Sequence, residues 1–206
     1  AARRSQSESW FRSKRWSEKP PVGSRVNPGD FSSTQLGLFL LMNEGVGGRL
    51  FDISGYQASG TFKTATTGLP AWKATLFGWC VDALSGPGAY VNVVPQGSLL
   101  NGSWTLEFVF QRQTTGSSFY FSSPNGTNAN RIFSYAVNGG TTVRTDIWDQ
   151  NGSAATVDTP QSITDNSTFH SYVLTHDNNT LVNSCYLDGF FQASVTSSAS
   201  LTGDGR

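Results

Sequence analysis

Short segments of alternating apolar and polar residues constrain this chain most. The clearest is residues 104–111, WTLEFVFQ, in which bulky apolar side chains stand at every second position. Successive side chains of a β-strand point to opposite faces of a sheet, so the pattern predicts a strand with one buried face. No segment has a helical period of useful length. The chain is therefore expected to be all-β.

Comparable segments recur along the chain, separated by clusters of Gly, Asn, Ser and Pro that are typical of turns. Asn138-Gly139-Gly140 and Asp188-Gly189 are hairpin signals, and Asn151-Gly152 marks another turn. So many short strands predict a sandwich or a barrel. The predicted strands are residues 36–42, 90–94, 104–111, 119–122, 131–138, 142–148, 169–176, 183–187 and 190–195.

The composition agrees with this expectation and excludes some functions. The 206 residues fit the length of one all-β domain, and 13% aromatic residues can fill a sizeable core. No apolar run reaches the roughly 20 residues of a membrane span, and no signal peptide is visible. Cys80 and Cys185 lack metal-ligand neighbours, and a disulfide and two buried thiols both stay open.

The charge is zero overall but unevenly distributed. Up to Arg25 there are seven basic and two acidic residues, whereas the remainder has seven basic and twelve acidic ones. We therefore predict a basic, aromatic arm and linker over residues 1–30. Such an arm can bind nucleic acid, but docking on a neighbouring subunit or domain is favoured because the basic run is short and no nucleic-acid-binding fold follows. The arm residues are Trp10, Phe11, Arg12, Lys14, Arg15 and Trp16.

Several motifs occur in a consistent order from residue 36 to residue 194. They are LGLFLLMNEGVGGRLFDISGYQASGTF (36–62), the stretch 78–91 that ends GPGAYV, WTLEFVFQ (104–111), FHSYVLTHD (169–177) and CYLDGFFQAS (185–194). Together they resemble the laminin-G-like branch of the concanavalin A-like lectin/glucanase superfamily. The resemblance implies a two-sheet antiparallel jelly-roll sandwich, here over residues 31–206, with sheets about 10 Å apart.

The resemblance also implies that the last strands of the sandwich are missing. Family members normally continue past Leu201 with strands that close the sandwich, whereas this sequence ends at Arg206. We therefore expect an open sheet edge near the C-terminus. Such an edge invites pairing with a strand of a partner protein.

The resemblance raises the question of calcium, because some members bind Ca²⁺ in their loops. Asp52 is the residue in position for such a site, which needs several converging oxygen ligands. However, Ala58 and Ala89 stand where the family often has an amide and an acid, and Leu84-Ser85-Gly86 replaces a Phe-Asp-Gly turn. A turn-stabilising role for Asp52 is therefore favoured, and no cofactor is predicted.

The sequence lacks the residue pattern of an active site. Glucanases on this fold carry a Glu-x-Asp-x-x-Glu run along one strand, and none exists here. Asp146 and Asp149 stand at an odd spacing, which places them on opposite faces of a strand. His170 shares a face with Tyr172 and Leu174, which predicts a ring packed in the sheet. We therefore expect that the protein is not an enzyme.

Binding is the remaining chemistry, because aromatic rings stack on sugars while Asn and Asp bond their hydroxyls. The candidate ligand-binding residues are Tyr135, Trp148, Asp146, Asn138 and Asn151, in and beside two adjacent predicted strands. A lectin-like binding or adhesion module is the favoured hypothesis, with glycans or a surface as its target. A purely structural protein of a virion or surface assembly stays open, and a glucanase is less favoured. Either setting predicts an extracellular, cell-surface or virion-surface location.

Overall fold

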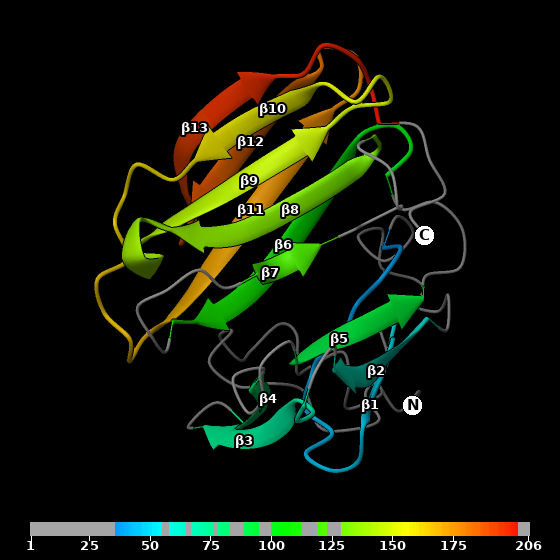
Figure 1. Cartoon of the computed structure of the whole chain (residues 1–206), viewed down its shortest axis with the longest axis vertical. Helices are drawn as coiled ribbons and strands as arrows, with labels where there is room; N and C mark the ends of the chain where they lie inside the picture. The colour runs from blue at the N-terminus through cyan, green and yellow to red at the C-terminus, as the bar shows by residue number, and fades with distance from the viewer. Residues whose placement is uncertain are drawn as a thin grey trace, which may run out of the picture. The chain divides into compact units, whose positions relative to one another are not determined.

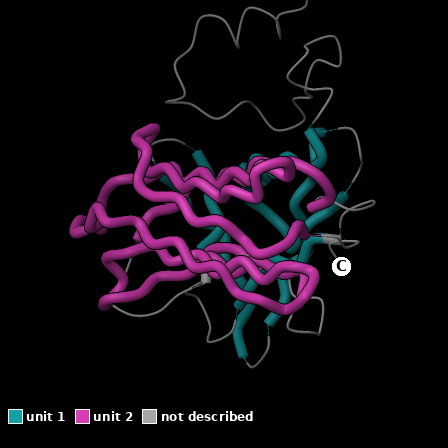
Figure 2. The backbone as a smooth tube through the Cα atoms, turned by 90° about the horizontal axis from the view of Figure 1, so that it is seen from above, with its two compact units in different colours: residues 1–96 teal, residues 97–206 magenta. Residues whose placement is uncertain are grey.

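The computed structural model describes residues 36–54, 58–64, 67–75, 78–82, 89–94, 100–112, 119–122 and 129–201. The chain divides into two compact units, residues 1–96 and 97–206 (Figure 2). The predicted arm and its boundary at residue 30 lie outside the described residues and stay predictions. Among the described residues, no helix has the length and hydropathy to cross a membrane.

The first unit is built from two small antiparallel sheets. One has the order β1 (Arg49–Phe51), β2 (Ser59–Thr64), β5 (Ala89–Val94), and the other pairs β3 (Ala71–Thr75) with β4 (Gly78–Asp82). The buried apolar residues described in this unit include Leu50, Ala58 and Phe62. The strands of this unit are short, with three to six residues each. The sequence had not predicted β1, β2 or β3. Strand β1 has only three residues, β2 is largely polar and contains glycine, and β3 does not alternate.

The strand predicted over residues 36–42 is wrong. Only Leu40 forms a bridge, to Asp52. Met42 has φ = 53°, a left-handed conformation that ends extended structure. The amide of Phe39 donates to a side chain, the Oδ1 atom of Asp52 (2.9 Å), and not to a neighbouring strand.

The second unit contains two four-stranded antiparallel sheets (Figure 1). The first has the order β10 (Ala154–Asp158), β9 (Thr142–Trp148), β8 (Arg131–Val137), β7 (Phe119–Ser122). The second has the order β13 (Phe190–Thr196), β12 (Val182–Leu187), β11 (Phe169–Asp177), β6 (Trp104–Gln111). The predicted all-β, antiparallel two-sheet class is thus confirmed. Strand β10 had not been predicted.

Alternation decides which side chains enter the core of the second unit. Along β8 and β11 every second residue is buried, as the period of a half-buried strand requires. Ile132 and Ile147 from the first sheet meet Tyr172 and Leu174 from the second in one cluster. The two sheets therefore enclose a common core (Figure 1).

The two predicted hairpin turns lie where the chain reverses direction between paired strands. Asn138 and Gly139 both have positive φ (53° and 68°) in the short 3-10 turn η3 (Asn138–Gly140), between β8 and β9. Asp188 and Gly189 also have positive φ (52° and 83°) between β12 and β13. Two consecutive left-handed residues match the twist of a tight hairpin. Both hairpin predictions are confirmed.

Both cysteines are thiols, so the disulfide left open by the sequence does not form. Cys80 lies in β4 and Cys185 in β12. Cys185 is fully buried, and this burial raises the pKa of its thiol. A buried protonated thiol is unreactive and serves as a small apolar core residue.

Candidate functional site

The face of strands β8, β9 and β10 that points away from the core carries the candidate site. Every second residue of each strand lies on it, and antiparallel pairing aligns Tyr135 with Arg144, and Asp146 with Thr156. We call this surface the outer face. Its residues are Arg131, Phe133, Tyr135, Arg144, Asp146, Trp148, Thr156 and Asp158.

A hydrogen-bonded row crosses the middle of the outer face. The Tyr135 hydroxyl donates to Asp146 Oδ2 (2.7 Å), and the Thr156 hydroxyl donates to Asp146 Oδ1 (2.7 Å). Partial burial and the contact with Asp146 raise the pKa of Tyr135, so the phenol is protonated at neutral pH. Tyr135 and Asp146, two of the predicted binding residues, are therefore in contact and on one face.

An ion pair holds the neighbouring part of the face. Arg144 Nε and Nη2 donate to the two oxygens of Asp158, each at 2.8 Å. This bidentate geometry fixes both side chains more firmly than a single contact does. The hydrogen bonds and charge of Asp158 raise the pKa of Arg144. Arg144 is thus a fixed cation beside Tyr135.

Trp148, the third predicted binding residue on this face, packs against a cation. Arg131 stands opposite it in register, and the Arg131 guanidinium carbon lies 4.5 Å from the Trp148 ring centroid and 4.8 Å from that of Phe133. Arg131 Nε is buried and has no hydrogen-bond partner. One face of the indole is therefore covered by Arg131.

The other two predicted residues, Asn138 and Asn151, are both exposed but lie at opposite ends of β9. At about 3.4 Å per residue the strand between them spans ~20 Å. Asn138 Nδ2 donates to Thr142 Oγ1 (3.3 Å), whereas Asn151 follows the Trp148 end. The five predicted residues therefore do not gather at one point: three lie on the outer face, and the two asparagines lie beyond opposite ends of β9.

Five residues of the outer face had not been singled out: Arg131, Phe133, Arg144, Thr156 and Asp158. Stepping by two from Tyr135 and Trp148 places the first three on the same face. Only the register of the strands shows that Arg131 meets Trp148, and that Arg144 meets Asp158.

Asp149, one residue beyond β9, is buried and has a structural role. Its Oδ1 atom accepts from the amides of Asn151 (2.9 Å) and Ser153 (3.0 Å), and Ser198 Oγ donates to its Oδ2 atom. Burial acts to raise the pKa of Asp149, but these hydrogen bonds outweigh it and lower the pKa. Asp146 and Asp149 therefore differ as predicted: the first is on the outer face and the second is in the interior.

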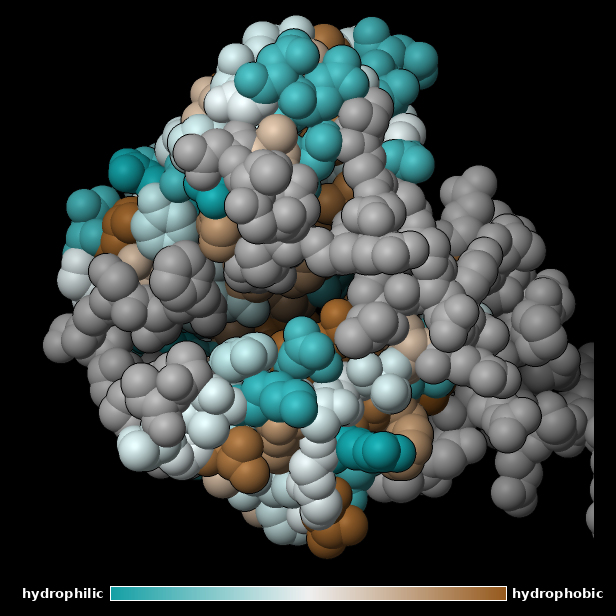
Figure 3. All heavy atoms as spheres, turned by 45° about the vertical axis from the view of Figure 1, so that its right-hand side comes forward, coloured by the Kyte–Doolittle hydropathy of each residue, from teal (hydrophilic) through white to brown (hydrophobic). Residues whose placement is uncertain are grey.

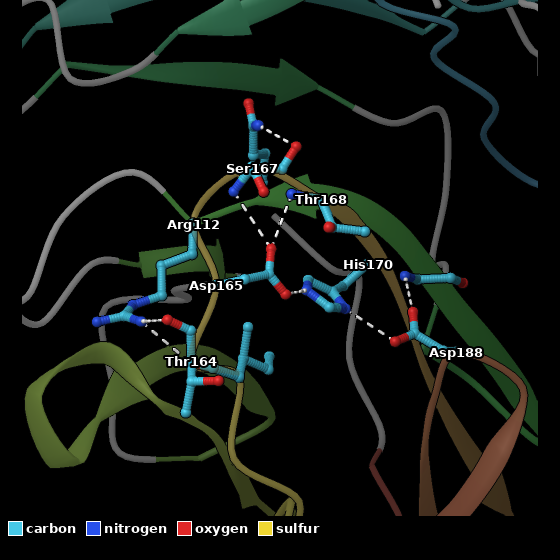
Figure 4. Close-up of polar contacts among 10 residues, drawn as sticks. Arg112, Thr164, Asp165, Ser167, Thr168, His170 and Asp188 are labelled. Carbon is cyan, nitrogen blue, oxygen red and sulfur yellow. Dashed lines mark hydrogen bonds and ion pairs between the residues drawn. The ribbon is translucent and has the colours of Figure 1, made fainter.

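A second cluster contains residue types that could do chemistry (Figure 4). His170 lies between two carboxylates: its Nδ1 atom is 2.8 Å from Asp188 Oδ2 and its Nε2 atom is 3.3 Å from Asp165 Oδ2. Hydrogen bonds from Thr168 and Ser167 lower the pKa of Asp165. With a carboxylate facing each ring nitrogen, His170 connects β11 to two turns. The prediction of a buried ring holds, since His170 lies on the core side of β11.

The loop before the same strand is held by Arg112. This buried side chain donates from Nη1 to the carbonyls of Ile163 (3.0 Å) and Thr164 (3.2 Å) (Figure 4). Its Nη2 atom donates to the carbonyl of Gly139 (3.2 Å). Backbone carbonyls in the loop and the η3 turn are thus bridged by one guanidinium. Together with His170 it gives this end of the sandwich a structural network.

Asp52, the residue considered for calcium, is occupied by protein donors. Its Oδ1 atom accepts from the amides of Phe39 and Ser54, both at 2.9 Å. Its Oδ2 atom accepts from Ser54 Oγ (2.7 Å) and the amide of Ala58 (3.2 Å). In the part of the chain that the structure describes, no group of three His, Cys, Asp or Glu side chains could hold a metal ion. The geometry assigns Asp52 a turn-stabilising role.

Several large apolar side chains of the first unit are exposed. In Figure 3 hydrophobic residues reach the surface in the lower part of the view, where the strands of this unit lie in Figure 1. Its large exposed apolar residues include Val46, Phe51, Leu69, Trp79 and Tyr90. Exposed apolar residues of this kind are common singly on protein surfaces, so they define no site by themselves.

One family model matches the chain, that of the concanavalin A-like lectin/glucanases superfamily, over residues 85–206. This is more than half of the 206 residues. No curated protein is significantly similar in sequence.

Two kinds of solved structure are similar at low identity. The CBM40 module of the Ruminococcus gnavus IT-sialidase, bound to α2,3-sialyllactose, is 15% identical over 51% of this chain and 58% of that chain (TM-score 0.37). The receptor-binding domain of botulinum neurotoxin type G is 14% identical over 82% of this chain and 41% of that chain (TM-score 0.43). The match spans less than two thirds of either structure, and at these TM-scores neither carries a functional argument.

Proposed function

Because the chain belongs to the concanavalin A-like lectin/glucanases superfamily, we propose that it is a non-catalytic, lectin-like module that binds a glycan on the outer face of β8, β9 and β10. The setting proposed for it is a surface: extracellular, on a cell or on a virion. Membership of the family does not establish that this chain binds a glycan. The support for glycan binding comes from the residues of the outer face.

The observation that carries the proposal is the convergence of Tyr135, Asp146 and Trp148 on one outward face. Aromatic rings provide flat apolar surface for a sugar ring, and the phenol, carboxylate and guanidinium groups provide directional hydrogen bonds. Arg144–Asp158 and Tyr135–Asp146 hold these groups in place before a ligand arrives. Preorganised groups lose less conformational entropy on binding, which favours recognition on this face.

The state of the carboxylates supports binding without catalysis. A glycosidase needs one carboxyl group that is protonated at working pH, beside a second ionised one. On the outer face, Asp158 is paired with Arg144, and Asp146 accepts two hydroxyl hydrogen bonds. Elsewhere, hydrogen bonds lower the pKa of Asp165 and Asp177, which is the direction opposite to that of a general acid.

A glycan array with the full chain tests the proposal, followed by titration of the strongest ligand. We expect Trp148→Ala to weaken binding about three- to tenfold, because a stacked ring contributes about 0.5–1.5 kcal/mol. Phe190→Ala, which removes an exposed aromatic side chain outside the outer face, is the matched control and should bind normally. Absence of any array signal, or equal binding by the Trp148 and Phe190 variants when both are folded by circular dichroism, would contradict the proposal.

A structural role in a larger assembly is the second candidate, and one observation favours it. Strand β13 is the last strand on its side of the second sheet, and no strand is hydrogen-bonded beyond it among the described residues. An unpaired edge can add a strand from a partner protein. An assembly assay separates this role from glycan binding. Loss of oligomers on substituting exposed residues of β13, without loss of glycan binding, would favour the structural role.

A further inference from the structure

We propose that the glycan bound on the outer face is acidic, and that the guanidinium of Arg131 holds its anionic group, a carboxylate or a sulfate. This ligand class rests on the proposed function, since it requires a glycan on the outer face. Arg131 is the first residue of β8 and is paired with Trp148 of β9. The selection of an acidic sugar follows from the charges of the second unit, the ring contacts of Arg131 and the acceptors beside it.

Cationic side chains are scarce in the second unit. Residues 97–206 contain no lysine and four arginines, Arg112, Arg131, Arg144 and Arg206, and the structure describes the first three. Arg112 is buried and donates to backbone carbonyls, and Arg144 forms an ion pair with Asp158. Among the described residues, Arg131 has neither a carboxylate partner nor a hydrogen-bond acceptor. It is therefore the described cation of this unit that is available to an anionic ligand.

Aromatic rings hold the Arg131 guanidinium by its flat face. Its central carbon lies 4.8 Å from the ring centroid of Phe133 and 4.5 Å from that of Trp148. A contact of this kind uses the face of the cation and leaves the N–H groups at its edge for hydrogen bonds. Of the three guanidinium nitrogens, only Nε is buried without a partner. The two Nη groups have no partner among the described residues and are not buried, so a ligand can reach them.

A guanidinium held in this way favours an anionic group over a neutral one. Its N–H groups can only donate, and their planar fork matches two oxygens of a carboxylate or a sulfate. A neutral sugar hydroxyl can also accept from Arg131, but a hydrogen bond between two charged groups is about twice as strong. The ring contacts restrict the side chain before the ligand binds, which lowers the entropic cost of binding.

Asp146 supplies acceptors for the hydroxyl groups of the same sugar. Its two oxygens accept from two protein hydroxyls, and each carboxylate oxygen has a further lone pair for a ligand hydroxyl. Asp146 stands two residues along β9 from Trp148, the partner of Arg131, which is ~7 Å at the rise of a strand. The charge of Asp146 repels an anionic group and attracts hydroxyl hydrogens. The ligand is therefore oriented with its anionic group at Arg131 and its hydroxyls toward Asp146.

Matched glycans test the ligand class without any change in the protein. The full chain is applied to an array of glycans that end in glucuronic acid, each beside its carboxyl-reduced counterpart ending in glucose and a sulfated form of that counterpart. The set that binds best is then titrated by calorimetry. We expect an acidic member to bind about tenfold or more tightly than the neutral one, because a hydrogen bond to a charged group contributes about this much. The carboxylated and sulfated members distinguish the two anions, and a preference for either supports selection of an acidic sugar.

Substitution of Arg131 tests which residue makes the selection. Arg131→Met keeps an apolar stem beside the rings and removes the charge, so the preference for the acidic member should disappear. Arg131→Lys keeps the charge without the planar fork and should give an intermediate preference, which also provides a test if the methionine variant does not fold. The matched control is Val109→Glu at an exposed position of β6, in the other sheet. It changes the net charge by the same amount as Arg131→Met and should keep the full preference.

Two results would overturn the selection of an acidic sugar while leaving glycan binding in place. One is equal or tighter binding of the neutral member of each set by the unmodified chain. The other is a preference for the acidic member that persists in Arg131→Met or is lost equally in Val109→Glu, with each variant folded by circular dichroism. Absence of binding to every glycan, neutral ones included, would instead contradict the proposed function, and the ligand class with it.

Discussion

Hydroxyl groups form a connected path through the core of the second unit. Ser134 Oγ lies 2.9 Å from Thr145 Oγ1, which lies 2.7 Å from the hydroxyl of Tyr172. All three residues are fully buried. Burying three hydroxyl groups is tolerated because each has a partner. The path ties one sheet to the other at the level of single atoms.

Removing the end of this path should destabilise the fold. Tyr172→Phe deletes the hydroxyl and leaves the Thr145 hydroxyl with one partner fewer in the core, which costs about 1–2 kcal/mol. Urea denaturation followed by tryptophan fluorescence measures the change in the free energy of unfolding. Tyr186→Phe, on the outward side of β12, is the control and should change stability little. Equal effects of the two variants would contradict the role given to the buried path.

Asp149 should make the free energy of unfolding depend on pH in the acid range. Its folded-state pKa lies below the ordinary value of 3.8, so its contribution is fully present above that value and is lost as the pH falls through the folded-state pKa. Asp149→Asn should therefore lower the free energy of unfolding at pH 7 by about 1–3 kcal/mol. The difference between the two proteins should shrink as the pH falls below 3.8. A difference that stays constant from pH 7 to pH 2 would contradict this account.

At the scale of strands, alternation predicts the second unit better than the first. The segment 104–111 and the two glycine hairpins were predictable because their periods and turn residues agree with each other. Residues 36–42 were not, because an apolar run does not reveal that Met42 takes positive φ or that Asp52 occupies the amide of Phe39.

Part of the candidate site was also predictable from the sequence. Even spacing places Tyr135 with Phe133, and Asp146 with Trp148, on one face once the hairpin at Asn138 is recognised. The contact of Arg131 with Trp148 depends on pairing register. The cluster around His170 joins a loop, a strand and a turn that are distant in sequence, so no local pattern indicates it.

Strand packing in the first unit can be tested at Gly60 in β2. A methyl group there would lie 2.8 Å from Val91 Cγ1 and 2.9 Å from Leu50 Cδ1. Gly60→Ala should therefore cost about 1–3 kcal/mol through overpacking, and Val91→Ala in the same chain should recover part of that loss. Thermal denaturation of the single and double variants measures both effects. An additive double variant would show that the contact with Val91 is not the cause.

At the scale of the whole molecule, the core cluster of the second unit is self-contained. All its buried members lie between Leu100 and Leu201, within the unit that begins at residue 97. A fragment of residues 97–206 should therefore fold alone, because the described members of this cluster all come from within it. Far-UV circular dichroism with a cooperative thermal transition is the expected result. A fragment without cooperative unfolding would show that the first unit is required for folding.

The outer face of β8, β9 and β10 has its polar groups fixed in pairs, with aromatic rings beside them. A face built in this way suits a polar ligand, which is why the proposed glycan site is placed there.

The most direct test of the central claim is an NMR titration of the full chain with the glycan that binds best on the array. We expect the largest shifts on the Trp148 indole N–H and on the amides of Arg131 and Asp146, and no shifts in β11 to β13. Shifts confined to the loop around Asp52 or to the β13-β12-β11-β6 sheet, with the outer face unaffected, would contradict glycan binding on the outer face.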